Sequence, residues 1–137
     1  MNRYQDPAEV EAILGGGKRV AVVGLSADPG KASHQVSRYL IEAGWDVIPV
    51  NPNANEVLGR PSYPDLRSVP GTIDVVDIFR PPSAVGPVVD EAIEVGAKAV
   101  WQQLGIYNAD ADERARNAGL RSVADLCIKI ELAKRKA

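Results

Sequence analysis

A short loop near the N-terminus carries the residue types that bind phosphate groups. It runs from Gly24 to Lys31, between the apolar segment Val20–Val23 and a segment with helical periodicity. Small residues let backbone N–H groups approach a ligand, and the positive end of a helix dipole attracts an anion. Ser26 and Lys31 add a hydroxyl and an ammonium group. We therefore expect free loop amides that receive a phosphate-bearing nucleotide.

Two common nucleotide motifs do not fit this loop. Ser26 stands where the second glycine of the dinucleotide pattern G-x-G-x-x-G belongs, and the second predicted strand ends at Asn51 without the acidic residue that holds a ribose hydroxyl. Five residues rather than four separate Gly24 from Gly30–Lys31, and Ala32 replaces the magnesium-binding Ser or Thr of a P-loop. NAD(P) binding and ATP hydrolysis are therefore disfavoured.

Strand-like and helix-like segments alternate along the whole chain with short connections. This alternation predicts one domain, residues 1–137, with a Rossmann-like, doubly wound, mostly parallel α/β sheet and helices on both faces. Residues 1–17 form a leading helix and glycine linker, and residues 124–137 a C-terminal helix. The predicted strands are Val20–Val23, Trp45–Asn51, Asp74–Phe79, Ala97–Trp101 and Leu120–Val123.

Local signals predict the ends of these elements. Pro49 places the second strand near a sheet edge, because proline cannot donate to a strand ladder. The segment 57–61 predicts a small edge hairpin, Leu66 and Val69 are expected to be buried anchors, and Pro87 is expected in the first turn of its helix. The polar residues expected to be N-caps are Asp6, Ser33, Ser83, Asn108 or Asp110, and Asp125.

Composition excludes several classes of partner. The net charge of −2 and the scarcity of aromatic residues argue against a nucleic-acid partner. No apolar run reaches membrane-spanning length, so no membrane partner is expected. A single cysteine, Cys127, excludes an internal disulfide and is typical of a reducing compartment. A cytoplasmic protein is the expectation.

Ligands of doubly wound sheets bind beyond the carboxyl ends of the strands. The segments leaving those ends should share one crevice. They are Gly24–Lys31, Val50–Asn53, Phe79–Ser83 and Trp101–Ile106.

Five motifs along the chain belong together: Val23-Gly-Leu-Ser26 with Gly30-Lys31-x-Ser33, Val47-x-Pro49-Val50-Asn51-Pro52, Asp74-Val-Val-Asp77-x-Phe79-Arg80-Pro-Pro82, Gly96-Ala-Lys98-Ala-Val-Trp101-x-Gln103-Leu-Gly105-Ile106 and Cys127-Ile-Lys129. With these motifs the chain resembles the stand-alone CoA-binding proteins, which are similar to the N-terminal CoA-binding domain of the succinyl-CoA synthetase α subunit. The resemblance covers nearly the whole chain and implies a Rossmann-like fold with coenzyme A as the ligand. Its one visible departure is Asp125–Leu126–Cys127, where members often carry Asp-Arg-Cys.

The resemblance also implies a set of ligand contacts. The first loop would meet the phosphates, the end of the second strand would border the adenosine, the third strand's end would wall the nucleotide, and the fourth would lie toward the pantetheine. In that order the residues are Gly24, Leu25, Ser26, Gly30 and Lys31; Val50, Asn51 and Pro52; Phe79, Arg80, Pro81 and Pro82; and Trp101, Gln103 and Gly105.

Some of these residues have a second interpretation. Arg80 could bind the 3′-phosphate of CoA or pair with Asp77 or Asp46, and Trp101 could line the site or cap the core. Lys31 has the alternative of a solvated loop lysine.

We expect His34, the only histidine, to be exposed. Cys127 is expected to pack as a small apolar residue, although its place near a helix start would suit a redox-sensitive thiol. The sequence predicts no catalytic residue and no metal site.

The sequence thus favours a protein that binds CoA, or a short acyl-CoA, without chemistry of its own. Two alternatives stay open: an acyl-CoA-handling enzyme subunit that needs a partner chain, and a redox or regulatory protein that joins Cys127 to the CoA thiol. NAD(P) binding is a third, less favoured one.

Overall fold

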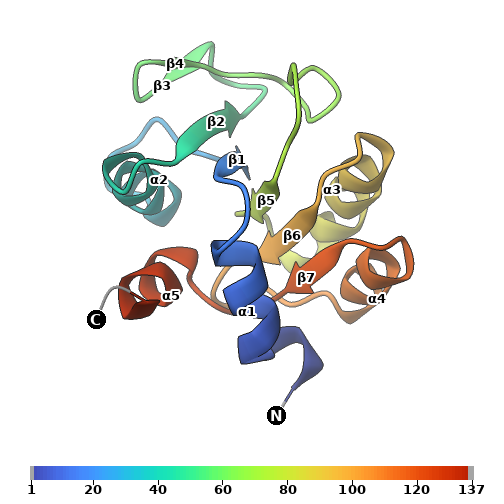
Figure 1. Cartoon of the computed structure of the whole chain (residues 1–137). Helices are drawn as coiled ribbons and strands as arrows, with labels where there is room; N and C mark the ends of the chain where they lie inside the picture. Colours follow the sequence, from blue (N-terminus) through green and yellow to red (C-terminus); the bar gives the residue numbers. More distant parts are fainter. Residues whose placement is uncertain (1, 136–137) are drawn as a thin grey trace.

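A parallel sheet forms the centre of the computed structural model, which describes residues 2–135 (Figure 1). Its strand order is β2-β1-β5-β6-β7, and all four neighbouring pairs are parallel, which confirms the predicted doubly wound α/β fold. The strands are β1 (Arg19–Val23), β2 (Asp46–Val50), β5 (Val75–Ile78), β6 (Ala99–Gln102) and β7 (Arg121–Val123).

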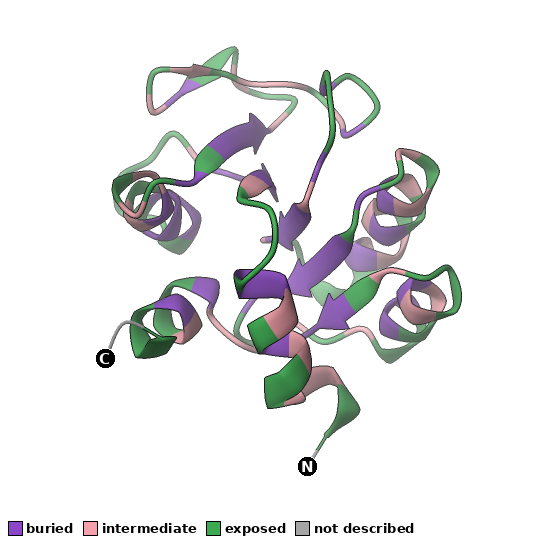
Figure 2. Cartoon of the chain, in the orientation of Figure 1, coloured by how far each residue is buried: buried purple, intermediate pink, exposed green. Residues whose placement is uncertain are grey.

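Helices cover both faces of this sheet. Side chains alternate along each strand, so β1 directs Val20 and Val22 to one core and Ala21 and Val23 to the other. The first core packs under α1 (Pro7–Leu14), α2 (Ala32–Glu42) and α5 (Ile128–Arg135), and the second under α3 (Pro82–Glu94) and α4 (Ala109–Asn117). The sheet is therefore buried from both sides, as Figure 2 shows.

The chain reverses direction in the strand order at β1. It leaves β1 through α2 to reach β2 on one side, and later returns through β5 on the other side of β1. This is the switch point at which doubly wound sheets open a crevice between the carboxyl ends of their strands.

A short 3₁₀ turn, η1 (Arg3–Gln5), precedes α1.

The predicted edge features are confirmed. β2 is an edge strand, so Pro49 needs no second ladder partner. The segment after it forms the antiparallel hairpin β3 (Glu56–Val57) and β4 (Arg60–Pro61). Leu66 and Val69 are buried in the second core.

Two helices begin at the expected polar caps. The Asp6 carboxylate accepts a hydrogen bond from the Ala8 N–H at 3.0 Å, with Pro7 in the first helical position. Asn108 Oδ1 accepts from the Ala111 N–H at 3.0 Å and begins α4. The caps at these two helix starts are therefore local, as the sequence indicates.

The predicted caps of α2 and α3 are wrong. The N-cap of α2 is Lys31, and the Ser33 hydroxyl inside the helix accepts from the Ser26 N–H instead. The N-cap of α3 is Pro81, because the fixed φ of the next proline suits the first helical position. Ser83 therefore lies within α3, and Pro87 falls in the second turn rather than the first.

Candidate functional site

A cavity of about 380 Å³ lies at the carboxyl ends of β1, β2 and β5. Three of the four predicted segments contribute to it, through Gly24, through Val50–Asn53, and through Phe79 with Arg80. The structure thus brings the first three strand ends together at the switch point. The full lining is Val23, Gly24, Val50, Asn51, Pro52, Asn53, Pro64, Asp65, Leu66, Phe79, Arg80, Pro87, Val88 and Glu91.

The outer wall of this cavity was not predicted from the sequence. It comes from Pro64–Leu66, in the loop before β5, and from Pro87, Val88 and Glu91 of α3. Glu91 joins the two parts by accepting hydrogen bonds from the Leu66 N–H and from Arg67. The only sequence signal for this wall was the expectation that Leu66 is a buried anchor.

Gly24 is required by the close approach of β1 and β5. Its φ is +88°, and a Cβ built there would lie 2.4 Å from the Phe79 carbonyl oxygen. Its own N–H donates to the Val50 oxygen at 2.9 Å, so this position also joins β1 to β2. No side chain fits here without moving backbone.

The amides of the first loop are less free than expected. Ser26 N–H donates to Ser33 Oγ at 3.0 Å, and Asp28 N–H to Ser26 Oγ at 3.0 Å. Gly30 N–H donates to Asp28 Oδ1 at 2.9 Å, and Lys31 N–H to the Asp28 carbonyl at 3.0 Å. The prediction of an open set of donors is therefore wrong for these four groups. Within residues 2–135, the N–H groups in and just after the loop that donate to no protein oxygen are those of Leu25, Ala27, Ala32 and Ser33.

Lys31 stands at the start of α2 with its side chain exposed. Its backbone is extended (φ −85°, ψ 146°), and its carbonyl accepts the first hydrogen bonds of the helix from His34 and Gln35. The ammonium group has no carboxylate partner among the described residues. Lys31 directly precedes Ala32 and Ser33, whose N–H groups are unpaired, and the helix dipole at this end favours an anion.

His34 is buried, so the expectation of an exposed histidine is wrong. It keeps 7% of its surface accessible, and its Nδ1 lies 2.9 Å from the Ser26 carbonyl oxygen. This contact and the Ser33–Ser26 hydrogen bond both hold the loop against α2. His34 thus acts as a brace for the loop.

Asn51 braces the second predicted segment. Its side-chain amide donates to the Leu25 carbonyl at 3.0 Å, while its Oδ1 accepts from the Asn53 N–H at 2.8 Å. The amide therefore ties the end of β2 to the end of β1. Leu25 is fully buried, whereas Pro52 is exposed at the rim of the cavity.

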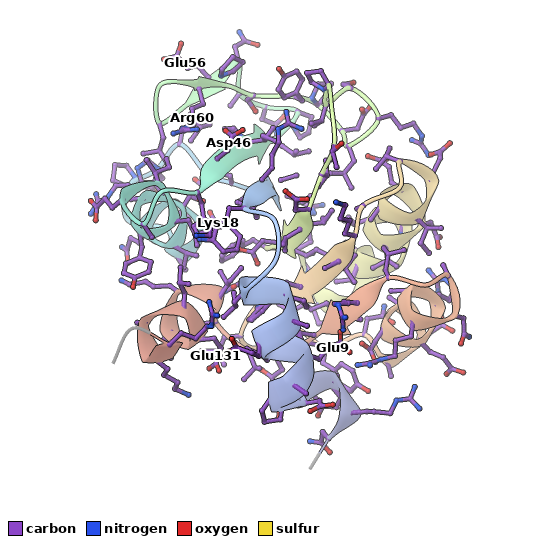
Figure 3. All side chains as sticks on the ribbon, viewed as in Figure 1. Glu9, Lys18, Asp46, Glu56, Arg60 and Glu131 are labelled. Atoms are coloured by element: carbon purple, nitrogen blue, oxygen red, sulfur yellow. The ribbon has the colours of Figure 1, made fainter. Side chains whose placement is uncertain are left out.

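Arg80 is exposed at the end of β5 and makes no ion pair or hydrogen bond with another described residue. The two carboxylates considered as its partners are not available. Asp46 is held by Arg19 at 3.3 Å and by Arg60 of the small hairpin at 3.2 Å, and Figure 3 shows Arg60 beside Asp46. Asp77 is buried in the core. The guanidinium at the cavity is therefore free.

Pro81 and Pro82 follow Arg80 but do not line the cavity. They begin α3, and the Pro82 carbonyl accepts a hydrogen bond from Asn108 Nδ2 at 2.9 Å. Their place in the structure is the joint between α3 and α4.

The fourth predicted segment lies apart from the cavity. Trp101 is fully buried and its indole N–H donates to the Leu126 carbonyl at 2.8 Å, so this residue caps the core. Gln103 Oε1 accepts from the Ile128 N–H at 2.9 Å, and Gly105 N–H donates to Asp125 Oδ1 at 2.7 Å. These three residues connect the end of β6 to the start of α5.

Asp125 does not cap α5, which begins at Ile128. It has a φ of +58°, and its carboxylate is used by Gly105. The residue before α5 is Cys127, whose carbonyl accepts from the Glu131 N–H at 3.0 Å. The Cys127 side chain is half-buried and packs against the first core.

Asp77 is the most unusual side chain in the sheet. It is fully buried on the first core's side of β5, between Val22 and Trp101, and neither carboxylate oxygen has a hydrogen-bond partner. Burial raises the pKa of Asp77 well above its ordinary value, because a buried charge without a partner is costly. The neutral acid is therefore the favoured form in the folded protein.

Two further structural findings bear on the kind of site. Within residues 2–135, no group of three or more His, Cys, Asp or Glu side chains is arranged to hold a metal ion. In the same part of the chain, no helix combines the length and the apolar character needed to cross a bilayer.

A parallel doubly wound sheet with a cavity at its switch point, and with an unpaired arginine in the lining of that cavity, is typical of nucleotide-binding α/β domains. Residues 18–133 match the family described as CoA binding domain, and the chain belongs to that family.

Individual relatives agree with this assignment. The chain is 40% identical over 123 residues to the uncharacterized protein YneT of Bacillus subtilis, covering 90% of this chain and 91% of that protein. A solved structure of a hypothetical protein from Pyrococcus horikoshii has a TM-score of 0.91 at 38% identity, with both chains fully covered. The chain is also 31% identical over 121 residues to an ADP-forming acetate–CoA ligase of Archaeoglobus fulgidus. That match covers 81% of this chain but only 18% of the ligase.

Proposed function

We propose that this protein binds coenzyme A, or a short acyl-CoA, noncovalently at the switch-point cavity and without catalysing a reaction on it. The observation that supports the proposal best is the coincidence of the family match with a cavity at the carboxyl ends of β1, β2 and β5.

The phosphates of CoA are assigned to the start of α2. Lys31 supplies a positive charge there, and the unpaired N–H groups of Ala32 and Ser33 supply donors. Because the amides of Ser26, Asp28 and Gly30 already donate to protein oxygens, these residues shape the loop rather than donate to the ligand.

The adenosine is assigned to the cavity itself. A volume of about 380 Å³ lies near the lower end of the range for small-molecule sites, roughly 300–1,000 Å³. It accommodates part of the ligand only, so the pantetheine arm would run along the surface outside the cavity. Val50, Pro52 and Phe79 provide the apolar contacts that a base requires.

The chemistry of the lining fits a binding site for the nucleotide half of the ligand. It contains no thiol, hydroxyl, imidazole or amine side chain. Its two carboxylates are engaged, Asp65 by Ser68 and Glu91 by Arg67 and the Leu66 amide. Hydrogen bonds from Ser68 lower the pKa of Asp65, which keeps it ionised and makes it a poor base.

Native mass spectrometry of freshly purified protein, followed by calorimetry with CoA, tests the proposal. We expect CoA to bind and the Lys31→Ala variant to bind it about 1.5–3 kcal/mol more weakly, the scale of a charge-assisted hydrogen bond. Lys18→Ala is the matched control, since this exposed lysine precedes β1 at the opposite end of the strand. Absence of CoA binding would refute the proposal.

The same measurements separate the other functions. Noncovalent binding survives Cys127→Ala, whereas a mixed disulfide with the CoA thiol is lost in that variant and on addition of reductant. Turnover of an acyl-CoA that appears only with a partner chain would show an enzyme subunit instead.

A further inference from the structure

We propose that Arg80 recognises the phosphate on the ribose of the bound nucleotide, so that the site selects 3′-phosphorylated CoA over its dephosphorylated form. This inference rests on the proposed function. It adds the side chain that distinguishes CoA from the closely related dephospho-CoA.

The first argument is the position of Arg80 in the cavity. It lines the cavity together with Val50–Asn53, at the end of β2. In doubly wound sheets the end of the second strand approaches the ribose of the nucleotide. A group on the opposite wall, at the end of β5, is therefore placed to reach a substituent on that ribose.

The second argument is the missing carboxylate. Sites that read a free ribose hydroxyl place an acidic residue at the end of the second strand, and sites that accept a ribose phosphate place an arginine nearby. Here β2 ends in Val50 and Asn51, and the Asn51 side chain is already committed to Leu25 and Asn53. The carboxylate that would read a ribose hydroxyl is therefore missing from this strand end, whereas Arg80 fits a phosphate.

The third argument is that Arg80 is kept free. Both carboxylates that line the cavity are taken, Glu91 by Arg67 and the Leu66 amide, and Asp65 by Ser68. The guanidinium therefore retains its full donor set for a bidentate contact with an oxyanion. Lys31 is outside the lining of the cavity, so the two cations serve different phosphates.

Calorimetry with CoA, dephospho-CoA, NADP⁺ and NAD⁺ on wild type and Arg80→Ala tests this assignment. We expect wild type to bind CoA about tenfold or more tightly than dephospho-CoA. Arg80→Ala should reduce the affinity for CoA by a similar factor and leave that for dephospho-CoA unchanged. Arg80→Lys should recover part of the difference, because an ammonium keeps the charge but not the bidentate geometry.

Two control variants sharpen the comparison. Lys31→Ala should weaken CoA and dephospho-CoA equally, because both ligands carry the diphosphate. Arg38→Ala, an exposed arginine of α2 without an ion-pair partner among the described residues, should change neither. Within residues 2–135 Arg80 makes no ion pair or hydrogen bond, so its variants should unfold like wild type, which a thermal melt checks.

The outcomes separate the two proposals. If neither CoA nor dephospho-CoA binds, the proposed function fails and the Arg80 assignment fails with it. If both bind equally well, or if Arg80→Ala weakens both equally, CoA binding stands and the assignment is overturned. NADP⁺ binding more tightly than CoA would overturn the assignment to a 3′-phosphate.

Discussion

Replacing Asp77 by valine should make the protein more stable, and the gain should grow with pH. The side chain is fully buried on β5 between Val22 and Trp101, with both oxygens unpaired. A buried polar group without a partner costs about 1–3 kcal/mol even when it is neutral. Valine is β-branched, fits a central strand and removes that cost.

The pH dependence follows from the raised pKa of Asp77. Burial favours the protonated acid in the folded state, while the unfolded chain titrates near the ordinary value of 3.8. Below that value the carboxyl is protonated in both states, and stability is at its highest with respect to this group. As pH rises toward the raised pKa, each unit removes about 1.4 kcal/mol of stability. The loss ends once the folded-state carboxyl itself ionises.

Urea unfolding of wild type, Asp77→Val and Asp77→Asn between pH 4 and pH 8 measures both effects. Asparagine keeps a polar group of the same size but cannot ionise, so it separates polarity from charge. We expect the two variants to show parallel pH profiles and wild type to fall below both as pH rises. A wild-type profile parallel to that of Asp77→Asn would refute the reasoning, because Asp77 would then not change its protonation between the folded and unfolded states.

Three further variants test the architecture of the site. Gly24→Ala should destabilise the protein more than Gly44→Ala, as measured by thermal melting. Both positions have a positive φ, so alanine at either one adds a backbone strain of about 1–3 kcal/mol. Only at position 24 would the new Cβ also clash with the Phe79 carbonyl oxygen. Equal losses would mean that the backbone there relaxes freely. Asn51→Ala should lower both the stability of the protein and its affinity for CoA, because it removes the side-chain hydrogen bond that joins the ends of β1 and β2. An unchanged affinity in calorimetry would show that this hydrogen bond does not support the site. Asn108→Ala should cost about 0.5–2 kcal/mol in urea unfolding through the lost cap of α4, with CoA affinity retained.

The alternation of elements and the loop at the end of β1 were readable from the sequence because they depend on local pattern. Short β-branched runs such as Val20–Val23 form buried strands, and the glycines at strand and helix ends form turns wherever they occur. The caps at Asp6 and Asn108 were predictable for the same reason, since the acceptor and the donor lie within a few residues of each other.

What the sequence could not determine were the partners that polar groups find across the fold. The Ser33 hydroxyl is diverted from capping α2 to the Ser26 amide, and Asp125 is taken by Gly105. Each of these hydrogen bonds depends on which segments, far apart in the chain, meet in the fold. The spacing of residues along a short stretch of sequence does not contain that information. Arg80 is a third case, because only the fold shows that no carboxylate within residues 2–135 pairs with it.

By itself, then, the amino-acid sequence determined the class of fold and the sheet edge at which the cavity lies, because hydrophobic periodicity and turn chemistry act over a few residues. The tertiary structure alone decided which amides, carboxylates and cations at that edge remain unpaired. A group that already hydrogen-bonds within the protein is not available to a ligand. Whether it does so depends on contacts between residues far apart in the chain.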